Sequence, residues 1–281
     1  MDTNEKRRLQ ITACKIRMGI IEGVFNAKSG HPGGSLSIAD VLAYLYFKEM
    51  NIDPKNPKWE ERDRMVLSKG HTAPGLYSAL ANRGYFPVEY LKTLRKTDSF
   101  LEGHPDMKGT PGVDMSSGSL GQGISVACGM ALASKIDGDR FRVYSILGDG
   151  ELEEGQVWEA AMFASHKKLD TLVAIVDNNN LQIDGELDNV NSPYPIPEKF
   201  RAFNWHVIEV DGNDFDQLDS AFKEARTTKG QPTAIIMKTT KGKGVSFMEN
   251  KASWHGAAPN EQEYKIAMSE LQSALCELEK E

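Results

Sequence analysis

The sequence predicts an α/β fold: a parallel sheet with helices on both faces and a helical portion at its N-terminal end. Runs rich in Val, Ile and Leu, such as residues 142–147 and 171–177, alternate with segments whose apolar residues recur at helical spacing. The runs are continuous, which is typical of strands that are buried on both faces. Hydrophobic residues make up 40% of the 281, and no Pro/Gly/Ser-rich linker divides them, so we expect a single domain over residues 1–281.

The predicted elements follow one another in a regular order. Residues 4–27 and 35–50 are expected to be helices, and Ser35 stands where the N-terminal cap of the second one is expected. The Pro-rich stretch 191–200 is expected to be a surface connection. The other expected elements are a strand at 64–68, helices at 73–84 and 120–136, a strand at 142–147, a helix at 153–168, strands at 171–177 and 205–210, a helix at 214–228, a strand at 232–239 and an amphipathic helix at 260–281.

Composition and charge exclude several classes of function. The net charge is −7 and no long Lys/Arg tract occurs, which argues against a nucleic-acid or anionic-membrane surface. No segment approaches the ~20 apolar residues that span a bilayer. The charged start lacks the apolar core of a secretory signal. Cys14, Cys128 and Cys276 lack CxxC spacing and are expected to be reduced thiols. We therefore expect a cytoplasmic protein.

Acidic residues and glycines follow the strand at 142–147. GDGELEEG occupies 148–155, and DNNNLQIDG (177–185) follows the next strand of the same strand–helix–strand unit. Neighbouring strands lie ~4.8 Å apart, and two adjacent oxygen ligands of Mg²⁺ lie ~3 Å apart. Asp149 and an Asn of the second run can therefore meet on one cation, together with a backbone carbonyl. Ordinary turn chemistry explains GDG alone, but it explains the two motifs together less well.

The proposed cation would hold an anionic ligand. So few protein charges around a divalent ion leave coordination positions for a group such as a diphosphate. Gly148 and Gly150 carry no Cβ atoms that would obstruct it, and the N–H of Gly150 is a candidate donor to a phosphate oxygen.

Four of the six histidines stand next to glycine: His31, His71, His104 and His255. A single histidine is usually structural, and that is our interpretation of the other two, His166 and His206. Glycine lets a backbone approach a ligand, and imidazole donates or accepts a proton near neutral pH. Four such histidines in one chain therefore indicate acid–base or hydrogen-bonding groups for a polyhydroxylated substrate.

These segments resemble the transketolase family over about residues 8–260. The spacing of GDG and NN is the thiamine diphosphate signature, and GHPGG, LSKGH, EGHP, SSGSLGQG and HGA are similar to transketolase segments. The resemblance implies that Asp149, Asn179 and the carbonyl of Leu181 bind Mg²⁺, or another divalent cation such as Ca²⁺ or Mn²⁺.

The resemblance also implies roles around the cofactor. His31 is expected to face sugar hydroxyls, His71 and His104 to approach the diphosphate and the reacting carbons, and His255 to lie near both diphosphate and substrate. The backbone of Gly118 and Leu120 is expected to contact the aminopyrimidine, although Ser119 stands where larger members commonly have Pro. Glu154 and Glu159 match glutamates of a carboxylate network at the interface between protomers, and solvated helix faces are the alternative. The loop KTTKGKG (238–244) faces a phosphate or is a solvated turn; both readings stay open.

Chains of this family are more than twice as long, and their second domain supplies a glutamate to the aminopyrimidine. No segment here resembles that domain. The resemblance therefore implies the N-terminal subunit of a split transketolase, active with a separate C-terminal subunit, as a heterotetramer. The expected reaction moves a two-carbon ketol unit from a ketose phosphate to an aldose phosphate; pentose phosphate and specialised catabolic pathways both remain open.

Three rival readings remain at this point. The α subunit of a 2-oxoacid dehydrogenase E1 component also carries GDG and NN, but the GHPGG, NNLQIDG and HGA segments favour transketolase. Deoxyxylulose-phosphate synthase is a nearer relative that is usually one long chain. A non-catalytic thiamine diphosphate-binding partner subunit would not need all four glycine-flanked histidines.

Overall fold

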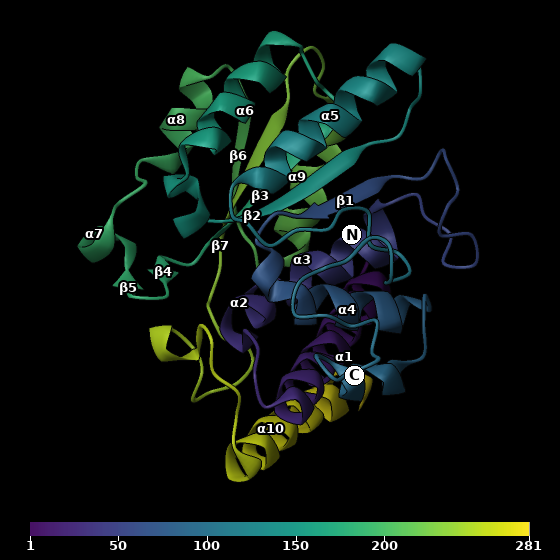
Figure 1. Cartoon of the computed structure of the whole chain (residues 1–281), viewed down its shortest axis with the longest axis vertical. Coiled ribbons are helices and arrows are strands. Elements are labelled where there is room, and N and C mark those ends of the chain that lie inside the picture. The colour runs from purple at the N-terminus through teal and green to yellow at the C-terminus, as the bar shows by residue number, and fades with distance from the viewer. Residues whose placement is uncertain (281) are drawn as a thin grey trace.

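Five parallel strands form the sheet that the apolar runs predict, in a computed structural model that describes residues 1–280 (Figure 1). Their order is β1-β2-β3-β7-β6. The strands are β1 (Arg64–Leu67), β2 (Val143–Gly148), β3 (Leu172–Asn178), β6 (His206–Asp211) and β7 (Thr233–Lys238). The α/β fold class with a parallel sheet is confirmed.

The three central strands, β2, β3 and β7, are buried along almost their whole length because helices cover both faces of the sheet. Side chains of each strand point alternately to the two faces. Tyr144 and Ile146 of β2 join one apolar core, whereas Val143 and Leu147 join the other. The edge strand β6 is only partly buried, as one free edge allows.

Two groups of helices cover the sheet (Figure 1). One core includes buried residues of α1 (Thr3–Ala27), α2 (Pro32–Ser37), α3 (Ala39–Tyr44), α4 (Ala73–Arg83), α9 (Phe215–Thr227) and α10 (Glu261–Lys280). The other includes residues of α5 (Gln122–Asp137), α6 (Gly155–His166) and α8 (Ile196–Ala202). Helices α1 and α10, from the two ends of the chain, pack against each other. The single-domain reading over residues 1–281 stays a prediction.

Smaller elements connect these layers. A hairpin of β4 (Leu181–Gln182) and β5 (Gly185–Glu186) and the short α7 (Leu187–Val190) follow β3. A π-helical segment follows α3 (Leu45–Glu49), and 3-10 turns occur at Gly70–Thr72, Val88–Thr93, Gly150–Glu153 and Ala252–Trp254. Within residues 1–280 no helix is long and apolar enough to cross a membrane.

Helix ends follow local chemistry where the sequence carries clear signals. The Asp2 carboxylate accepts the N–H of Glu5 at 2.8 Å and caps α1, and the Asp214 carboxylate caps α9 in the same way. Helix α4 ends at Arg83, and its capping residue Gly84 has a φ of 98°, which suits a residue without Cβ. Helix α10 is described to Lys280, so the expectation for Glu281 lies outside the described residues.

Two predictions about segments are wrong in part. The helix expected at 35–50 is divided: α2 begins at Pro32, whose fixed φ favours a first helical turn, and Ile38 interrupts the helix at φ −98° and ψ 6°. Ser35 is therefore not a cap; it is buried within α2, and its hydroxyl donates to the carbonyl of His31 at 2.7 Å.

The Pro-rich stretch 191–200 is only partly a surface connection. Its second half forms the first turns of α8, in which Ile196 and Phe200 are buried. Phe200 packs its ring 5.3 Å from that of Trp205. Burial of these apolar side chains against the sheet outweighs the low helix propensity of the prolines, one of which stands in the first turn, where it is tolerated.

Candidate functional site

Asp149 lies at the carboxyl end of β2 and is only 3% exposed. One oxygen of its carboxylate accepts the backbone N–H groups of Asn179 at 2.7 Å and Asn180 at 2.6 Å, and the other accepts that of Gly150 at 2.9 Å. Burial, reinforced by the charge of Asp177, raises the pKa of Asp149 to about 6. The tips of β2 and β3 thus converge as the sequence predicts.

The other two predicted metal ligands lie on the turn after β3. The side-chain oxygen of Asn179 accepts the N–H of Leu181 at 3.1 Å, and its amide nitrogen donates to Asp177 at 3.1 Å. The carbonyl of Leu181 accepts a hydrogen bond of 2.7 Å from Lys241. Among residues 1–280 no three His, Cys, Asp or Glu side chains gather as a metal site; the predicted set contains only one such side chain, with an amide and a carbonyl.

The two glycines of the GDG motif differ in their surroundings. The N–H of Gly150, expected to face a phosphate, donates to Asp149 instead, and a Cβ at this position would lie 3.2 Å from Cβ of Gln182. A Cβ on Gly148 would meet nothing closer than Cδ of Lys69 at 3.6 Å. The sequence predicted unobstructed space for a ligand beside both glycines, but the structure leaves such space beside Gly148 only.

A buried ion pair between Lys69 and Asp177 supports the site, and sequence reasoning missed it. Lys69 is 3% exposed and Asp177 is 0% exposed. Asp177 also accepts the hydroxyls of Ser37, at 2.6 Å, and Thr239. Burial alone would raise the pKa of Asp177, but the Lys69 ammonium and the hydroxyl donors hold it below its ordinary value. The signal was a lysine two positions before a histidine, in the sequence Lys69-Gly70-His71, but its partner Asp177 comes from a distant strand.

Glu151 is a second buried carboxylate that sequence reasoning left out. Its oxygens accept the hydroxyl of Ser68 and the N–H groups of Gly121 at 2.8 Å and Gly148 at 2.9 Å. It therefore joins the GDG turn to the loop 116–123 and to the end of β1. Burial raises the pKa of Glu151 despite these donors.

Three of the four glycine-flanked histidines form one cluster. The ring centroids of His31 and His71 lie 5.1 Å apart, those of His71 and His255 5.1 Å apart, and those of His31 and His255 5.5 Å apart. They come from the start of α2, the turn Gly70–Thr72 and the segment after Ala252–Trp254. Burial, with nearby positive charge, lowers the pKa of His31 to about 4, of His71 to about 2 and of His255 to about 3. All three are neutral at pH 7.

His104 lies outside these ring contacts. It is exposed, and the Cβ that Gly118 lacks would lie 3.4 Å from its ring, so His104 and the loop 116–123 are neighbours. Burial of part of the ring, and then the charge of Arg95, lowers the pKa of His104. His166 lies at the end of α6, and His206 contacts Glu224 at 2.7 Å at the start of β6, away from the cluster.

The loop expected to contact the aminopyrimidine packs closely against the turn after β1. A Cβ on Gly70 would lie 2.8 Å from the backbone nitrogen of Gly118, so only glycine fits there. The carbonyl of Leu120 accepts a hydrogen bond of 3.0 Å from Gln156. The two glutamates expected at an interface, Glu154 and Glu159, are exposed at the start and on the surface of α6.

The loop 238–244 is, as a whole, neither a phosphate-facing loop nor a solvated turn, which were the two alternatives that the sequence left open. Lys241 is only 2% exposed, with its ammonium 2.7 Å from the Leu181 carbonyl and 3.1 Å from Nδ1 of His255. Burial, and then the charge of Lys69, lowers the pKa of Lys241 to about 8. Lys238 is exposed, and Lys243 lies 3.8 Å from Glu249. One lysine of the loop thus belongs to the site.

The residues present suit a divalent cation and a diphosphate. Asp149, Asn179 and Leu181 supply oxygen atoms, which hard cations prefer. Two buried ammonium groups, Lys69 and Lys241, lie beside them and suit an anion. Three buried polar atoms around the histidine cluster and the loops have no hydrogen-bond partner in the described residues: Nδ1 of His31, Oγ of Ser117 and Oδ1 of Asn180. Such atoms are expected to find partners in a ligand.

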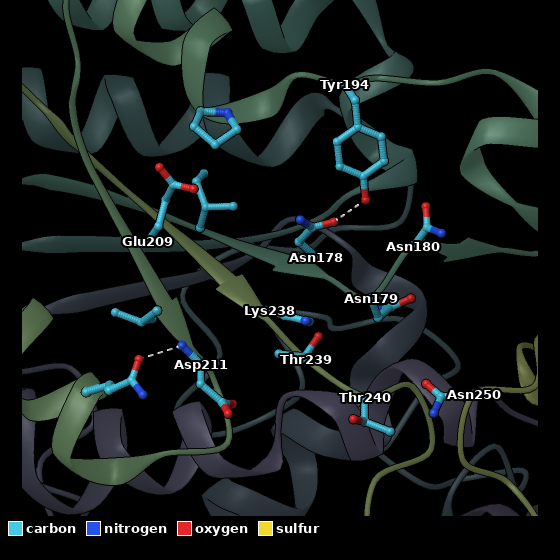
Figure 2. A pocket seen from close by; sticks show the side chains of 14 residues that line it. Asn178, Asn179, Asn180, Tyr194, Glu209, Asp211, Lys238, Thr239, Thr240 and Asn250 are labelled. Atoms are coloured by element: carbon cyan, nitrogen blue, oxygen red, sulfur yellow. Dashed lines mark hydrogen bonds between the residues drawn. The ribbon is translucent and has the colours of Figure 1, made fainter.

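A polar hollow of about 690 Å³ borders this edge of the sheet, beyond the ends of β3, β7 and β6 (Figure 2). The side chains of Asn178, Asn179 and Asn180 line one side, and Tyr194 donates to Asn178 at 2.6 Å. Asn179 is the residue that the hollow shares with the predicted metal ligands.

Comparisons with known proteins agree with the geometry. A family model described as the thiamine diphosphate-binding domain of transketolase matches residues 9–273. The 6-deoxy-6-sulfo-D-fructose transketolase subunit SqwG of Clostridium sp. (strain MSTE9) is 50% identical over 264 residues, which cover 94% of this chain and 96% of that protein. An apulose-4-phosphate transketolase subunit of Phocaeicola vulgatus is 41% identical over 273 residues, 97% of each chain.

Longer relatives are matched over less than half of their length. Human transketolase is 45% identical over 263 residues, which cover 91% of this chain and 40% of that one. The crystal structure of Campylobacter jejuni transketolase superposes with a TM-score of 0.89 at 32% identity, covering 99% of this chain and 46% of that chain. The chain therefore belongs to the transketolase family, as a subunit that corresponds to its thiamine diphosphate-binding domain.

Proposed function

We propose that this subunit binds thiamine diphosphate and a divalent cation and, with a separate C-terminal subunit, transfers a two-carbon ketol unit from a ketose phosphate to an aldose phosphate. The observation that carries the proposal is the set of hydrogen bonds that joins Asp149 to Asn179 and Asn179 to Leu181. Lys241 joins the Leu181 carbonyl in turn to His255, one of three clustered neutral imidazoles. Family membership favours this reaction over that of a 2-oxoacid dehydrogenase.

Mg²⁺, or Ca²⁺ or Mn²⁺ in its place, would be held by Asp149, Asn179 and the carbonyl of Leu181. A carboxylate offers about four lone-pair positions, and the Asp149 carboxylate uses three for backbone N–H groups, which leaves capacity for an ion. The ammonium groups of Lys69 and Lys241 would offset the charge of the diphosphate. When bound, thiamine diphosphate accepts the electron pair released as a carbon–carbon bond of the sugar breaks.

The histidines would position the sugar and pass protons. A neutral imidazole has one donor and one acceptor nitrogen, so His31 and His71 can each join two oxygen atoms. Nδ1 of His255 already contacts the Lys241 ammonium, so this ring can join one oxygen atom, through Nε2. Because the pKa values of all three histidines are lowered, they keep the neutral form at physiological pH. Nδ1 of His31 is buried without a partner in the described residues and is the natural position for a hydroxyl of the substrate. His104, which is more exposed, would receive the substrate from solvent.

The partner would bind over α5 and α6 and supply the glutamate that faces the aminopyrimidine. These helices expose large apolar side chains, Val126 and Ile136 on α5 and Met162 and Phe163 on α6, which is unusual for a surface that faces only water. Glu154 and Glu159 lie at the start of α6 and on it, as the interface reading requires. We propose that the two kinds of subunit form a heterotetramer, with two copies of each, in the cytoplasm.

The substrates are proposed from chemistry and similarity together. A relative with 50% identity is named for 6-deoxy-6-sulfo-D-fructose, a ketose with an anionic end. We propose that this subunit likewise serves a ketose that carries a negatively charged group, in either the pentose phosphate pathway or a specialised catabolic route.

The test is reconstitution. The purified chain alone should show almost no ketol transfer, whereas the chain mixed with a C-terminal transketolase subunit, Mg²⁺ and thiamine diphosphate should transfer the unit from a ketose phosphate. Asp149→Asn is the matched negative control. Full turnover by the chain alone would contradict the need for a partner. Release of CO₂ from pyruvate, without ketol transfer, would replace the proposal with a 2-oxoacid dehydrogenase.

A further inference from the structure

Lys241 connects two segments that the sequence places far apart. Its ammonium lies 2.7 Å from the carbonyl of Leu181, on the turn after β3, and 3.1 Å from Nδ1 of His255. The side chain is almost fully buried, so these contacts are not those of a solvated lysine that moves between partners. The loop that holds Lys241 is itself fixed, because the N–H of Gly242 donates to the carbonyl of Gly33 at 2.9 Å.

The chemistry of the two groups decides which nitrogen of the ring carries the proton. An ammonium group has three donors and no acceptor, so Nδ1 of His255 must accept. The ring is neutral at pH 7 because burial, together with the Lys241 charge, lowers the pKa of His255 to about 3. A neutral imidazole whose Nδ1 accepts carries its single proton on Nε2.

The position of the ring is set by its neighbours rather than by Lys241 alone. His255 stacks on His71 at an interplanar angle of 23°, and His31 meets it at 90°. These contacts are compatible with either tautomer. The hydrogen bond from Lys241 is therefore the feature that distinguishes the two.

We propose that Lys241 is a positioning residue that fixes His255 as its Nε2–H tautomer, so that the ring presents a donor to an oxygen of the cofactor or substrate. The role of that donor rests on the proposed function; the tautomer itself does not. The same ammonium also holds the Leu181 carbonyl, so the metal-binding turn and the imidazole are tied to one side chain. Loss of Lys241 would release both.

The experiment measures the tautomer directly. Histidine-selective ¹⁵N NMR of the full chain, without metal or cofactor at pH 7.0, distinguishes a protonated from an unprotonated ring nitrogen, and His255→Gln assigns the signals. Lys241→Met removes all donors at similar length, and Lys241→Arg keeps them. Lys243→Met is the matched control, because this lysine of the same loop is 41% exposed and has only a 3.8 Å contact with Glu249.

The expected result is an Nε2–H ring for His255 in the wild type, in Lys241→Arg and in Lys243→Met, and a mixture of tautomers in Lys241→Met. A wild-type ring protonated on Nδ1 would overturn the proposal, and so would an unchanged tautomer in Lys241→Met. The wild-type spectrum shows which ring nitrogen of His255 is protonated, even where a variant does not fold. The NMR experiment does not measure enzyme activity. A reconstituted enzyme that shows no ketol transfer would therefore not contradict the proposed tautomer of His255. A different tautomer would likewise not contradict the proposed ketol transfer.

Discussion

Lowering the pH from 7.5 to 5.5 is expected to destabilise the chain through its histidine cluster. His31, His71 and His255 have folded-state pKa values of about 4, 2 and 3, below the ordinary value of 6.5. The unfolded chain therefore binds protons between those values and 6.5 that the folded chain does not bind. The stability contributed by these groups is complete above pH 6.5 and is lost as the pH falls toward the folded-state values.

The magnitude follows from linkage. At pH 5.5, one unit below the unfolded value, a fully buried imidazole has lost about 1.4 kcal/mol of unfolding free energy. His71, the most buried of the three, is expected to lose about that much. Solvent screens the partly exposed His31 and His255, so the cluster as a whole is expected to lose about 3 kcal/mol. This is a large share of the 5–15 kcal/mol that typically separates a folded from an unfolded protein.

Urea unfolding at the two pH values, in metal-free buffer, tests the reasoning. Buried carboxylates such as Asp63 and Asp114 have raised pKa values and act in the opposite direction, so the comparison is made between variants. His71→Gln should lose about 1 kcal/mol less than the wild type between pH 7.5 and 5.5, whereas His166→Gln, at the end of α6, should match the wild type. Equal losses in His71→Gln and the wild type would refute the assignment.

Three further predictions concern the site and its supports. Asp149→Asn should weaken Mg²⁺-dependent binding of thiamine diphosphate at least about tenfold without unfolding the chain, since an amide replaces the only carboxylate among the ligands; unchanged affinity by calorimetry would count against the metal assignment. Glu151→Gln should cost about 1–3 kcal/mol in urea unfolding, because the NH₂ group cannot accept the N–H bonds that the carboxylate now accepts; an unchanged midpoint would contradict this role. Gly123→Ala should destabilise α5 by about 1–3 kcal/mol, because its Cβ would lie 2.5 Å from Oγ of Ser68. Gly129→Ala, whose Cβ would meet nothing within 4 Å, should stabilise the same helix by up to about 1 kcal/mol. Thermal melts that reverse this order of stability would overturn the packing argument.

Much of the fold was predictable because the strand signal is strong. The strands predicted at 142–147, 171–177 and 232–239 correspond to the three buried strands β2, β3 and β7. Convergence of Asp149 with Asn179 was predictable for the same reason, since the carboxyl ends of adjacent parallel strands meet at one edge. The three clustered histidines were recognised by their glycine neighbours, although the sequence alone did not bring them within 5.5 Å of one another.

What the sequence did not predict depends on contacts between distant segments. The Lys69–Asp177 pair joins the turn after β1 to the end of β3 across β2, and no local pattern announces it. Lys241 was one of three lysines in its loop, and only the fold distinguishes the buried one. The break between α2 and α3, where Ile38 has φ −98° and ψ 6°, also lacks a signal in the apolar pattern.

Under the proposed function, the pairing of Lys69 with Asp177 affects the order in which the cation and the diphosphate bind. With that aspartate paired to Lys69, the buried carboxylate of Asp149 and the buried ammonium of Lys241 remain at the predicted ligands. A divalent ion arriving alone would add uncompensated positive charge beside a buried ammonium, and a pyrophosphate arriving alone would add uncompensated negative charge beside a buried carboxylate. The charge of the cation and that of the diphosphate offset each other. The two should therefore bind together, as a preformed complex, rather than one after the other.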